Sequence, residues 1–141
     1  MEFTECDVCG FGLWNPIASL SRSTIGLYND ARFPGRCIVS LDIHKDNFEE
    51  LDEETTALFM EDIQKAMRAI KSATGADRVN MAILGNAESH VHAHLIPRYP
   101  DSEEFPKSSP WNDKRERAQL DAASVDLLRA SIRLYLLSNL S

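Results

Sequence analysis

The sequence predicts an α+β fold with a mainly antiparallel sheet of about five strands and two main helices. Two observations carry this prediction. Residues 90–96 alternate polar and apolar side chains with a period of two, which is typical of a half-buried strand. Residues 52–74 repeat apolar side chains every three or four positions, as one face of a helix does. The 141 residues, of which 43% are hydrophobic, are predicted to form a single domain over residues 1–141.

The first third of the chain is predicted to contain a loop and then a β-hairpin. Residues 11–23 mix glycine, proline and serine, and we interpret them as a loop. Residues 24–28 are expected to form a strand. The turn signal Phe33-Pro34-Gly35 then leads into a second, apolar strand over residues 36–41.

The helix predicted over residues 52–74 has end signals as well as an apolar stripe. Asp52 is expected to cap its first turn and Gly75 to close its last turn. The stripe consists of four residues at spacings of four, four and three, namely Phe59, Ile63, Met67 and Ile70.

The remaining predicted elements are a strand pair and a C-terminal helix. Residues 78–84 alternate well enough to form a strand, which a short loop joins antiparallel to residues 90–96. A second helix is expected to start at residues 120–122, with Asp121 as its cap. Its wide apolar face indicates packing on the sheet and suits a second subunit, and it consists of Leu127, Leu128, Ile132, Leu134, Tyr135 and Leu137.

Charge and composition exclude several classes of function. A formal net charge of −7 argues against an extended nucleic-acid surface, because such a surface needs a basic patch. No run approaches the ~18 consecutive apolar residues of a membrane span, so no membrane association is expected. The first residues lack a basic region and an apolar run, so no signal peptide is predicted. Three cysteines without such a signal indicate reduced thiols and a cytoplasmic location.

Three of the four histidines lie within five residues, at His90, His92 and His94. On a strand, alternate residues point to one face, so the imidazoles should form a row while the core receives Val91, Ala93 and Leu95. Such a row suits metal binding, because imidazole is a common zinc ligand. It also suits covalent catalysis, in which one histidine attacks and its neighbours stabilise the developing charge. A purely structural strand would more readily carry Thr, Lys or Glu.

An N-terminal C-x-x-C pair, Cys6 and Cys9, can bring two thiolates together. Alone, the pair is compatible with a redox site, half of a zinc site or coincidence. No strand precedes Cys6, which disfavours a thioredoxin-like role, and zinc would need two more ligands from elsewhere. His44 follows the strand at 36–41 and, taken alone, is compatible with a plain surface position.

The segment from His90 to Ile96, H-V-H-A-H-L-I, resembles the histidine triad (HIT) signature at every position, His-φ-His-φ-His-φ-φ with φ apolar. Gly85-Asn86 before it and Pro97-Arg98-Tyr99 after it are also similar to bacterial members. The resemblance implies a two-fold homodimer that acts on a small nucleotide as a hydrolase or nucleotidyl transferase. It implies that His92 attacks the α-phosphorus and becomes a nucleotidyl-histidine, while His94 hydrogen-bonds the phosphoryl oxygens or the leaving group.

The same resemblance implies residues that hold the substrate. Asn86 and Ser89 match polar positions around the α-phosphate, and the turn at Asn29 and Asp30 is expected to hold the ribose hydroxyls. Trp111 is either an anchor for the loop after Tyr99 or a wall of the nucleotide pocket.

The resemblance also implies a structural zinc ion. In the related galactose-1-phosphate uridylyltransferases, zinc is held by a C-x-x-C pair, a histidine in the connector after a strand and the first histidine of the motif. The corresponding residues here are Cys6, Cys9, His44 and His90.

Two departures from the family pattern leave the substrate open. Arg36 follows the Pro-Gly turn where many HIT hydrolases carry histidine, and the connector Ala87-Glu88-Ser89 lacks the apolar and proline residues of close bacterial relatives. Phosphoramidates, dinucleoside polyphosphates and nucleotidyl sugars all remain candidate substrates. Two other functions also remain, a metal-dependent hydrolase with catalytic zinc on the three histidines and a nucleotide-binding protein without turnover.

Overall fold

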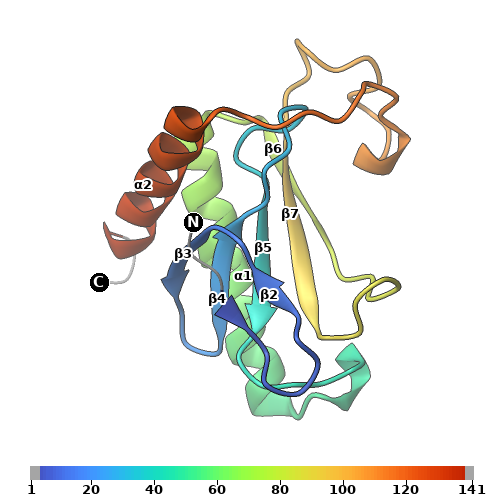
Figure 1. Ribbon diagram of the computed structural model, residues 1–141, viewed down its shortest axis with the longest axis vertical. Helices are drawn as coiled ribbons and strands as arrows, with labels where there is room; N and C mark the ends of the chain where they lie inside the picture. The colour runs from blue at the N-terminus through green and yellow to red at the C-terminus, as the bar shows by residue number, and fades with distance from the viewer. Residues whose placement is uncertain (1–3, 139–141) are drawn as a thin grey trace.

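The computed structural model describes residues 4–138, which form a five-stranded antiparallel sheet backed by helices (Figure 1). The strand order is β3 (Pro16–Ser19), β4 (Ser23–Leu27), β5 (Cys37–Leu41), β7 (His92–Arg98) and β6 (Arg78–Ala82). A separate small hairpin of β1 (Thr4–Glu5) and β2 (Gly12–Leu13) lies in front of the sheet in Figure 1. The predicted α+β fold class, with about five strands and two main helices, is confirmed.

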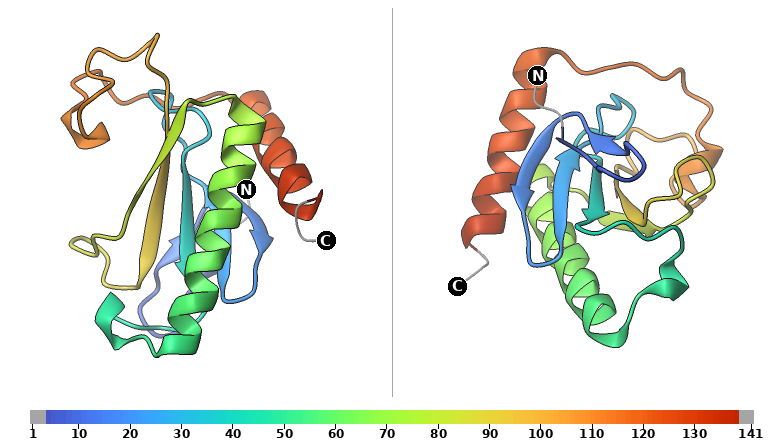
Figure 2. Two further views of the ribbon diagram at one scale, coloured as in Figure 1. Left: turned by 180° about the vertical axis from the view of Figure 1, so that it is seen from behind. Right: turned by 60° about the horizontal axis from the view of Figure 1, so that its bottom comes forward.

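Helix α1 (Glu53–Thr74) crosses the back of the sheet, as Figure 2 shows from behind. The Asp52 carboxylate accepts a hydrogen bond from the Thr55 backbone N–H at 2.8 Å, so the predicted N-cap is confirmed. Gly75 ends the helix in the left-handed conformation, as predicted. Of the predicted stripe, Phe59, Ile63 and Ile70 are fully buried and Met67 is half-buried.

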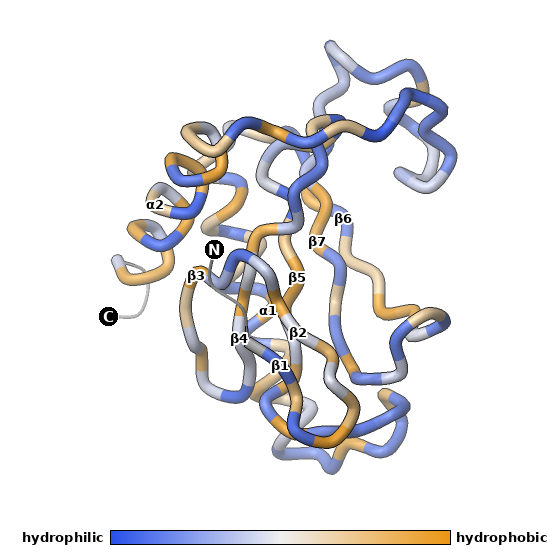
Figure 3. The backbone as a smooth tube through the Cα atoms, viewed as in Figure 1, coloured by the Kyte–Doolittle hydropathy of each residue, from blue (hydrophilic) through white to orange (hydrophobic). Residues whose placement is uncertain are grey.

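The core between sheet and helices fixes the face on which the histidines lie. Val91, Ala93 and Leu95 are buried in it, as predicted. Burial of a Leu or Val side chain contributes roughly 1.5–3 kcal/mol, and a slip of one residue would expose all three. The register of β7 is therefore strongly specified. Figure 3 shows apolar positions along β5, whereas the loop beyond β7 is mostly hydrophilic.

Several element boundaries differ from the prediction. Residues 11–23 were expected to be a loop, but they contain β2 and the edge strand β3. Strand β3 is short, starts at a proline and has an irregular register between Pro16 and Ala18, so it lacks a long alternating pattern. Strand β6 ends at Ala82, and β7 begins at His92, which leaves His90 just before the strand.

Helix α2 (Ala122–Ser138) packs beside α1 and near β3. Asp121 accepts a hydrogen bond from the Ser124 backbone N–H at 2.7 Å, which confirms the predicted cap. Only part of the predicted apolar face is buried, because the helix packs through a narrower stripe, Val125, Ile132 and Leu136. The other side stays exposed, with Leu127, Leu134 and Leu137. Within residues 4–138, neither helix is long and apolar enough to cross a membrane.

The long loop between β7 and α2 is tied down at both ends. At its start, Glu103 is buried and accepts hydrogen bonds from the Arg98 guanidinium and the Tyr99 backbone. At its end, the Asn29 amide accepts from the Leu120 backbone N–H at 2.7 Å and donates to the Leu120 carbonyl. These contacts fix both ends of the loop, and its last part passes the connection between β4 and β5 (Figure 1).

Gly35 has a positive φ of +98°, and a Cβ there would lie 2.6 Å from Thr74 Cγ2. Gly75 has a φ of +70° but nothing within 4 Å of such a Cβ. We expect Gly75→Ala to lower the free energy of unfolding by about 1 kcal/mol through backbone strain alone. Gly35→Ala should lower the free energy of unfolding by roughly 1–3 kcal/mol more than Gly75→Ala does, because its methyl group also clashes with Thr74. Urea unfolding of both variants tests this.

Thr74→Ser removes the crowding methyl group and keeps the hydroxyl that bonds the Ile70 carbonyl. In the Gly35→Ala background it should restore part of the lost stability. Equal losses for the two alanine variants would contradict the crowding.

Candidate functional site

The sheet register gathers polar side chains on the face opposite α1. His92 pairs with Ser40 and His94 with Ile38 across β5 and β7. One row further, the Tyr28 backbone N–H donates to the Arg36 carbonyl at 2.8 Å, so Tyr28 and Arg36 lie side by side. Alternate residues of antiparallel strands share a face. The row on this face therefore runs from His92 through His94 to Arg36.

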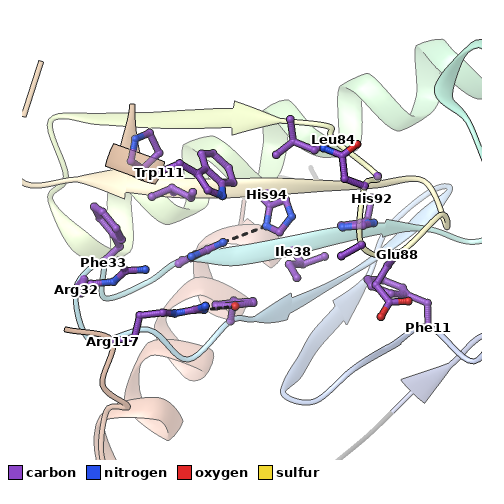
Figure 4. Close-up of a pocket in the computed structure, with 17 residues that line it drawn as sticks. Phe11, Arg32, Phe33, Ile38, Leu84, Glu88, His92, His94, Trp111 and Arg117 are labelled. Atoms are coloured by element: carbon purple, nitrogen blue, oxygen red, sulfur yellow. Dashed lines mark hydrogen bonds between the residues drawn. The ribbon is translucent and has the colours of Figure 1, made fainter. Parts of the chain in front are cut away.

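A cavity of about 670 Å³ covers this row (Figure 4). Its walls come from the N-terminal hairpin, the β4–β5 turn, the loop after β6 and the loop after β7. Its lining includes Phe11, Tyr28, Arg36, Asn86, Glu88, His92, His94, Trp111 and Arg117.

His92 has a defined tautomer. Its Nδ1 lies 2.6 Å from the backbone carbonyl of His90, which only accepts, so Nδ1 carries the proton. Burial lowers the pKa of His92, which keeps the imidazole neutral at pH 7. Phe11 stacks on the ring with a centroid distance of 4.6 Å. The result is a neutral imidazole whose Nε2 lone pair is free to attack.

His94 has the opposite tautomer, set by Arg36. The His94 Nδ1 lies 3.3 Å from Nη2 of Arg36, and because a guanidinium only donates, Nδ1 accepts and Nε2 carries the proton. Burial, the positive charge of Arg36 and the electrostatic effect of the neighbouring His92 imidazole lower the pKa of His94 to about 4. His94 is thus a neutral hydrogen-bond donor.

Arg36 is itself only 6% exposed. Its Nη1 donates to Asp30 at 3.0 Å, and its guanidinium lies 4.0 Å from the centroid of the Tyr28 ring. Its Nε has no acceptor among the described residues. Arg117, from the loop after β7, donates to the Tyr28 hydroxyl and lies 5.6 Å from the same ring. In the sequence Arg36 stood out only as a departure, and Arg117 carries no local signal.

Some of the predicted substrate residues line the cavity and others do not. Asn86 lines the cavity, and Trp111 lines its wall with an edge contact to His94 at 5.7 Å. Ser89 instead donates to Asp46 at 3.3 Å and is not among the lining residues. Of the two predictions for Trp111, the structure therefore favours the pocket wall.

Asn29 and Asp30 are held by protein partners and do not line this cavity. Asn29 binds the Leu120 backbone, and Asp30 is buried between Arg32 and Arg36. Burial alone would raise the pKa of Asp30, but the hydrogen bonds and charges of these arginines hold the pKa below its ordinary value. Asn29 lines a second cavity of about 1290 Å³, which shares Phe11 and Tyr28 with the first, and the ribose contact predicted for this turn stays a prediction.

The four predicted metal ligands lie together. One ligand atom from each of Cys6, Cys9, His44 and His90 lies within 4.8 Å of the others. Cys6 Sγ is 3.9 Å from Nδ1 of His44, and Cys9 Sγ is 3.6 Å from Nδ1 of His90. Within residues 4–138 this is the one group of three or more such side chains, and His92 and His94 lie outside it.

The groups around this cluster fit a metal. Nε2 of His90 donates to the Leu41 carbonyl at 2.8 Å, and Nε2 of His44 donates to Asp46 at 2.9 Å. Both imidazoles therefore turn an Nδ1 lone pair toward the thiols. The backbone N–H groups of Cys9 and Val8 lower the pKa of Cys6 to about 6, which favours a thiolate. Two thiolates and two imidazoles are a regular tetrahedral zinc set.

The HIT domain family model matches residues 17–101 of the chain. A histidine triad protein from Bradyrhizobium japonicum has a similar structure, with a TM-score of 0.77 and 26% identity over 86% of this chain and 89% of that chain. A comparison with curated protein sequences gives no match.

Two further solved structures share the fold. A Zn-bound histidine triad family protein from Mycobacterium smegmatis has a TM-score of 0.62 and 22% identity, covering 89% of this chain and 87% of that chain. A diadenosine triphosphate hydrolase from Plasmodium falciparum has a TM-score of 0.60 and 17% identity, covering 100% and 88%.

The low pKa of His94 makes stability depend on pH. The unfolded chain binds a proton at this residue near pH 6.5, and the folded chain near pH 4. The contribution of neutral His94 to folding is therefore complete above pH 6.5 and is lost as the pH falls through about 4. We expect an NMR titration of the imidazole to give a midpoint near 4, and Arg36→Gln to raise it.

The control is Arg68→Gln, on the exposed face of α1, which should leave the His94 midpoint unchanged. A wild-type midpoint near 6.5 would show that neither burial nor Arg36 acts on His94.

Proposed function

Because the chain belongs to the HIT domain family, we propose that it cleaves a nucleotide at the α-phosphate through a nucleotidyl-histidine intermediate on His92. One observation carries the proposal. The His90 carbonyl holds the Nδ1–H of His92 at 2.6 Å, which leaves Nε2 as an unprotonated nucleophile in a cavity large enough for a nucleotide.

The reaction has two steps. First, the Nε2 lone pair of His92 forms a bond to the α-phosphorus, and the bond from phosphorus to the leaving group breaks with its electron pair on the leaving group. The imidazole becomes positively charged, and the His90 carbonyl that accepts its Nδ1–H stabilises this charge. Water then attacks the phosphorus, loses a proton and releases His92 as neutral imidazole. A phosphate in place of water would give nucleotidyl transfer.

His94 and the loop after β6 stabilise the phosphoryl group. The Nε2–H of His94 is a fixed donor, because Arg36 occupies its Nδ1. Asn86 lines the same cavity and offers an amide to the phosphoryl oxygens. Donors fixed before the reaction cost no reorganisation as charge develops. Phe11 and Trp111 supply apolar walls for the rest of the substrate.

We also propose that Cys6, Cys9, His44 and His90 hold a structural zinc ion. When bound, the metal would supply a rigid cross-link between the N-terminal hairpin and the segment before β7, with four protein ligands and no open position. The residue it holds, His90, is the one whose carbonyl sets the tautomer of His92.

The geometry does not favour catalytic zinc on the three histidines. His90 turns its Nδ1 to Cys9, whereas His92 and His94 use Nδ1 for the His90 carbonyl and Arg36. A nucleotide-binding protein without turnover would keep the same cavity, so the covalent intermediate is the discriminating observation. The homodimer, the cytoplasmic location and the single domain stay predictions.

We expect brief exposure of the protein to an adenylated substrate to add one adenylyl group to the intact mass. His92→Ala should abolish this adduct and lower turnover by at least about a thousand-fold, because the nucleophile is gone. Arg68→Gln serves as the control and should form the adduct normally. Nucleotide binding without an adduct on any substrate would leave the binding-only function.

We expect native mass spectrometry to find one zinc ion per chain. Cys9→Ser should reduce zinc occupancy, and a chelator should lower the melting temperature, because the hairpin loses its cross-link. Cys37→Ser is the matched control, since the Cys37 thiol is buried in β5 away from the cluster and zinc should stay bound. A wild-type protein that takes up no zinc would contradict the proposed site.

A further inference from the structure

We propose that Arg36, Tyr28 and Arg117 form a subsite for an anionic leaving group, so that the substrate is a nucleoside 5′-phosphoanhydride rather than a phosphoramidate. This inference rests on the proposed attack by His92 and deepens it. It concerns the part of the substrate that departs, which the nucleophile alone does not specify.

The cavity has two electrostatically different ends. Figure 4 shows Glu88 and Phe11 near His92, and Arg32 and Arg117 at the opposite end. At that end Arg32 and Arg36 share one buried carboxylate, that of Asp30, and Arg117 adds a third guanidinium group to the lining, so positive charge is in excess there. This excess stands out in a chain of net charge −7. Positive charge lining a cavity attracts an anion.

Two of these guanidinium groups share one aromatic ring. Arg36 and Arg117 lie 4.0 and 5.6 Å from the centroid of Tyr28. Arg36 is 94% buried, and its Nε has no acceptor among the described residues. A buried cation with an unsatisfied donor is costly unless an anion or acceptor completes its surroundings. Guanidinium groups suit phosphate, because their paired N–H donors match its oxygens.

The order of residues along the sheet puts this subsite within reach of a leaving group that extends from His92 along the histidine row. With the α-phosphorus at His92, in-line displacement requires the leaving group on the far side of phosphorus from Nε2. The row on the sheet continues from His92 to His94 and then to Arg36. A leaving group that extends along this row meets His94 and then the two arginines.

The protonation that each leaving group requires also favours a phosphoanhydride substrate. A phosphate leaves as an anion, because the breaking P–O bond places its electron pair on an oxygen that needs no proton. An amine must be protonated to leave. His94 is a weak proton source, because Arg36 occupies its Nδ1 and it is neutral above a pKa of about 4. The cations at this end can stabilise negative charge without moving a proton.

The test compares substrates that share an adenylyl group and differ in what leaves. Diadenosine triphosphate and ADP-glucose release phosphates, whereas adenosine 5′-phosphoramidate releases ammonia. We expect at least one phosphoanhydride to exceed the phosphoramidate in kcat/KM by about tenfold or more. Whichever of diadenosine triphosphate and ADP-glucose has the higher kcat/KM shows whether the leaving phosphate belongs to a nucleotide or to a sugar. Arg117→Gln should lower the ratio of kcat/KM for that anhydride to kcat/KM for the phosphoramidate by about tenfold.

Arg68→Gln removes the same charge from the exposed face of α1 and should leave the ratio within about twofold. Arg117 is exposed, so its variant should fold, which circular dichroism checks. A wild-type preference for the phosphoramidate overturns the inference. So does an equal loss for both substrates, which would assign Arg117 to the α-phosphate. Both outcomes leave the adduct on His92 intact.

Absence of turnover with every substrate would refute the proposed function, and calorimetry then tests the subsite by itself. Inorganic triphosphate should bind the wild-type protein at least about tenfold more tightly than Arg117→Gln. Equal affinities, or no binding, overturn the subsite.

Discussion

The hydrogen bond from His92 Nδ1 to the His90 carbonyl is the interaction on which the site depends. It sets the tautomer of the proposed nucleophile, and its geometry depends on the position of the His90 backbone. The imidazole of His90 donates to the Leu41 carbonyl on β5 and turns its other nitrogen to Cys9 in the N-terminal hairpin. The register of β7 in turn depends on burying Val91, Ala93 and Leu95. Core packing, hairpin and reactivity are thus linked through one carbonyl group.

The four histidines show how surroundings divide identical side chains into different roles. A carbonyl accepts the proton of His92 at Nδ1, and a guanidinium donates to the same atom of His94. His90 and His44 instead donate from Nε2 to a carbonyl and a carboxylate, so both present Nδ1 to the two thiols. An imidazole has two nitrogens, and fixing the partner of one fixes the use of the other. Two histidines thereby have the geometry of metal ligands, and the other two have the geometry that the proposed phosphoryl chemistry requires.

Much of this arrangement could be predicted from the sequence, because its signals are local. The alternation in residues 90–96 predicts the strand and its face, and the stripe and caps of residues 52–74 predict α1. The metal cluster followed from a resemblance rather than from spacing. Strand β3 could not be predicted, since a short edge strand that starts at a proline has no alternating pattern. The roles of Tyr28 and Arg117 depend on segments that only the folded chain brings together. The ion pairs of Asp30 are local in the sequence, because Arg32 and Arg36 follow it two and six residues later.

Arg117 belongs to a loop, whereas His92 belongs to the central part of the sheet. Loops tolerate insertion and substitution far better than core strands do. The loop is held at its start by Glu103 and at its end by the contact between Leu120 and Asn29, so its sequence between these two anchors can vary while its ends stay in place. Selection can therefore change the proposed leaving-group subsite without disturbing the proposed nucleophile. Divergence among relatives should then concentrate in the segment from residue 100 to residue 120, leaving the histidine strand nearly invariant.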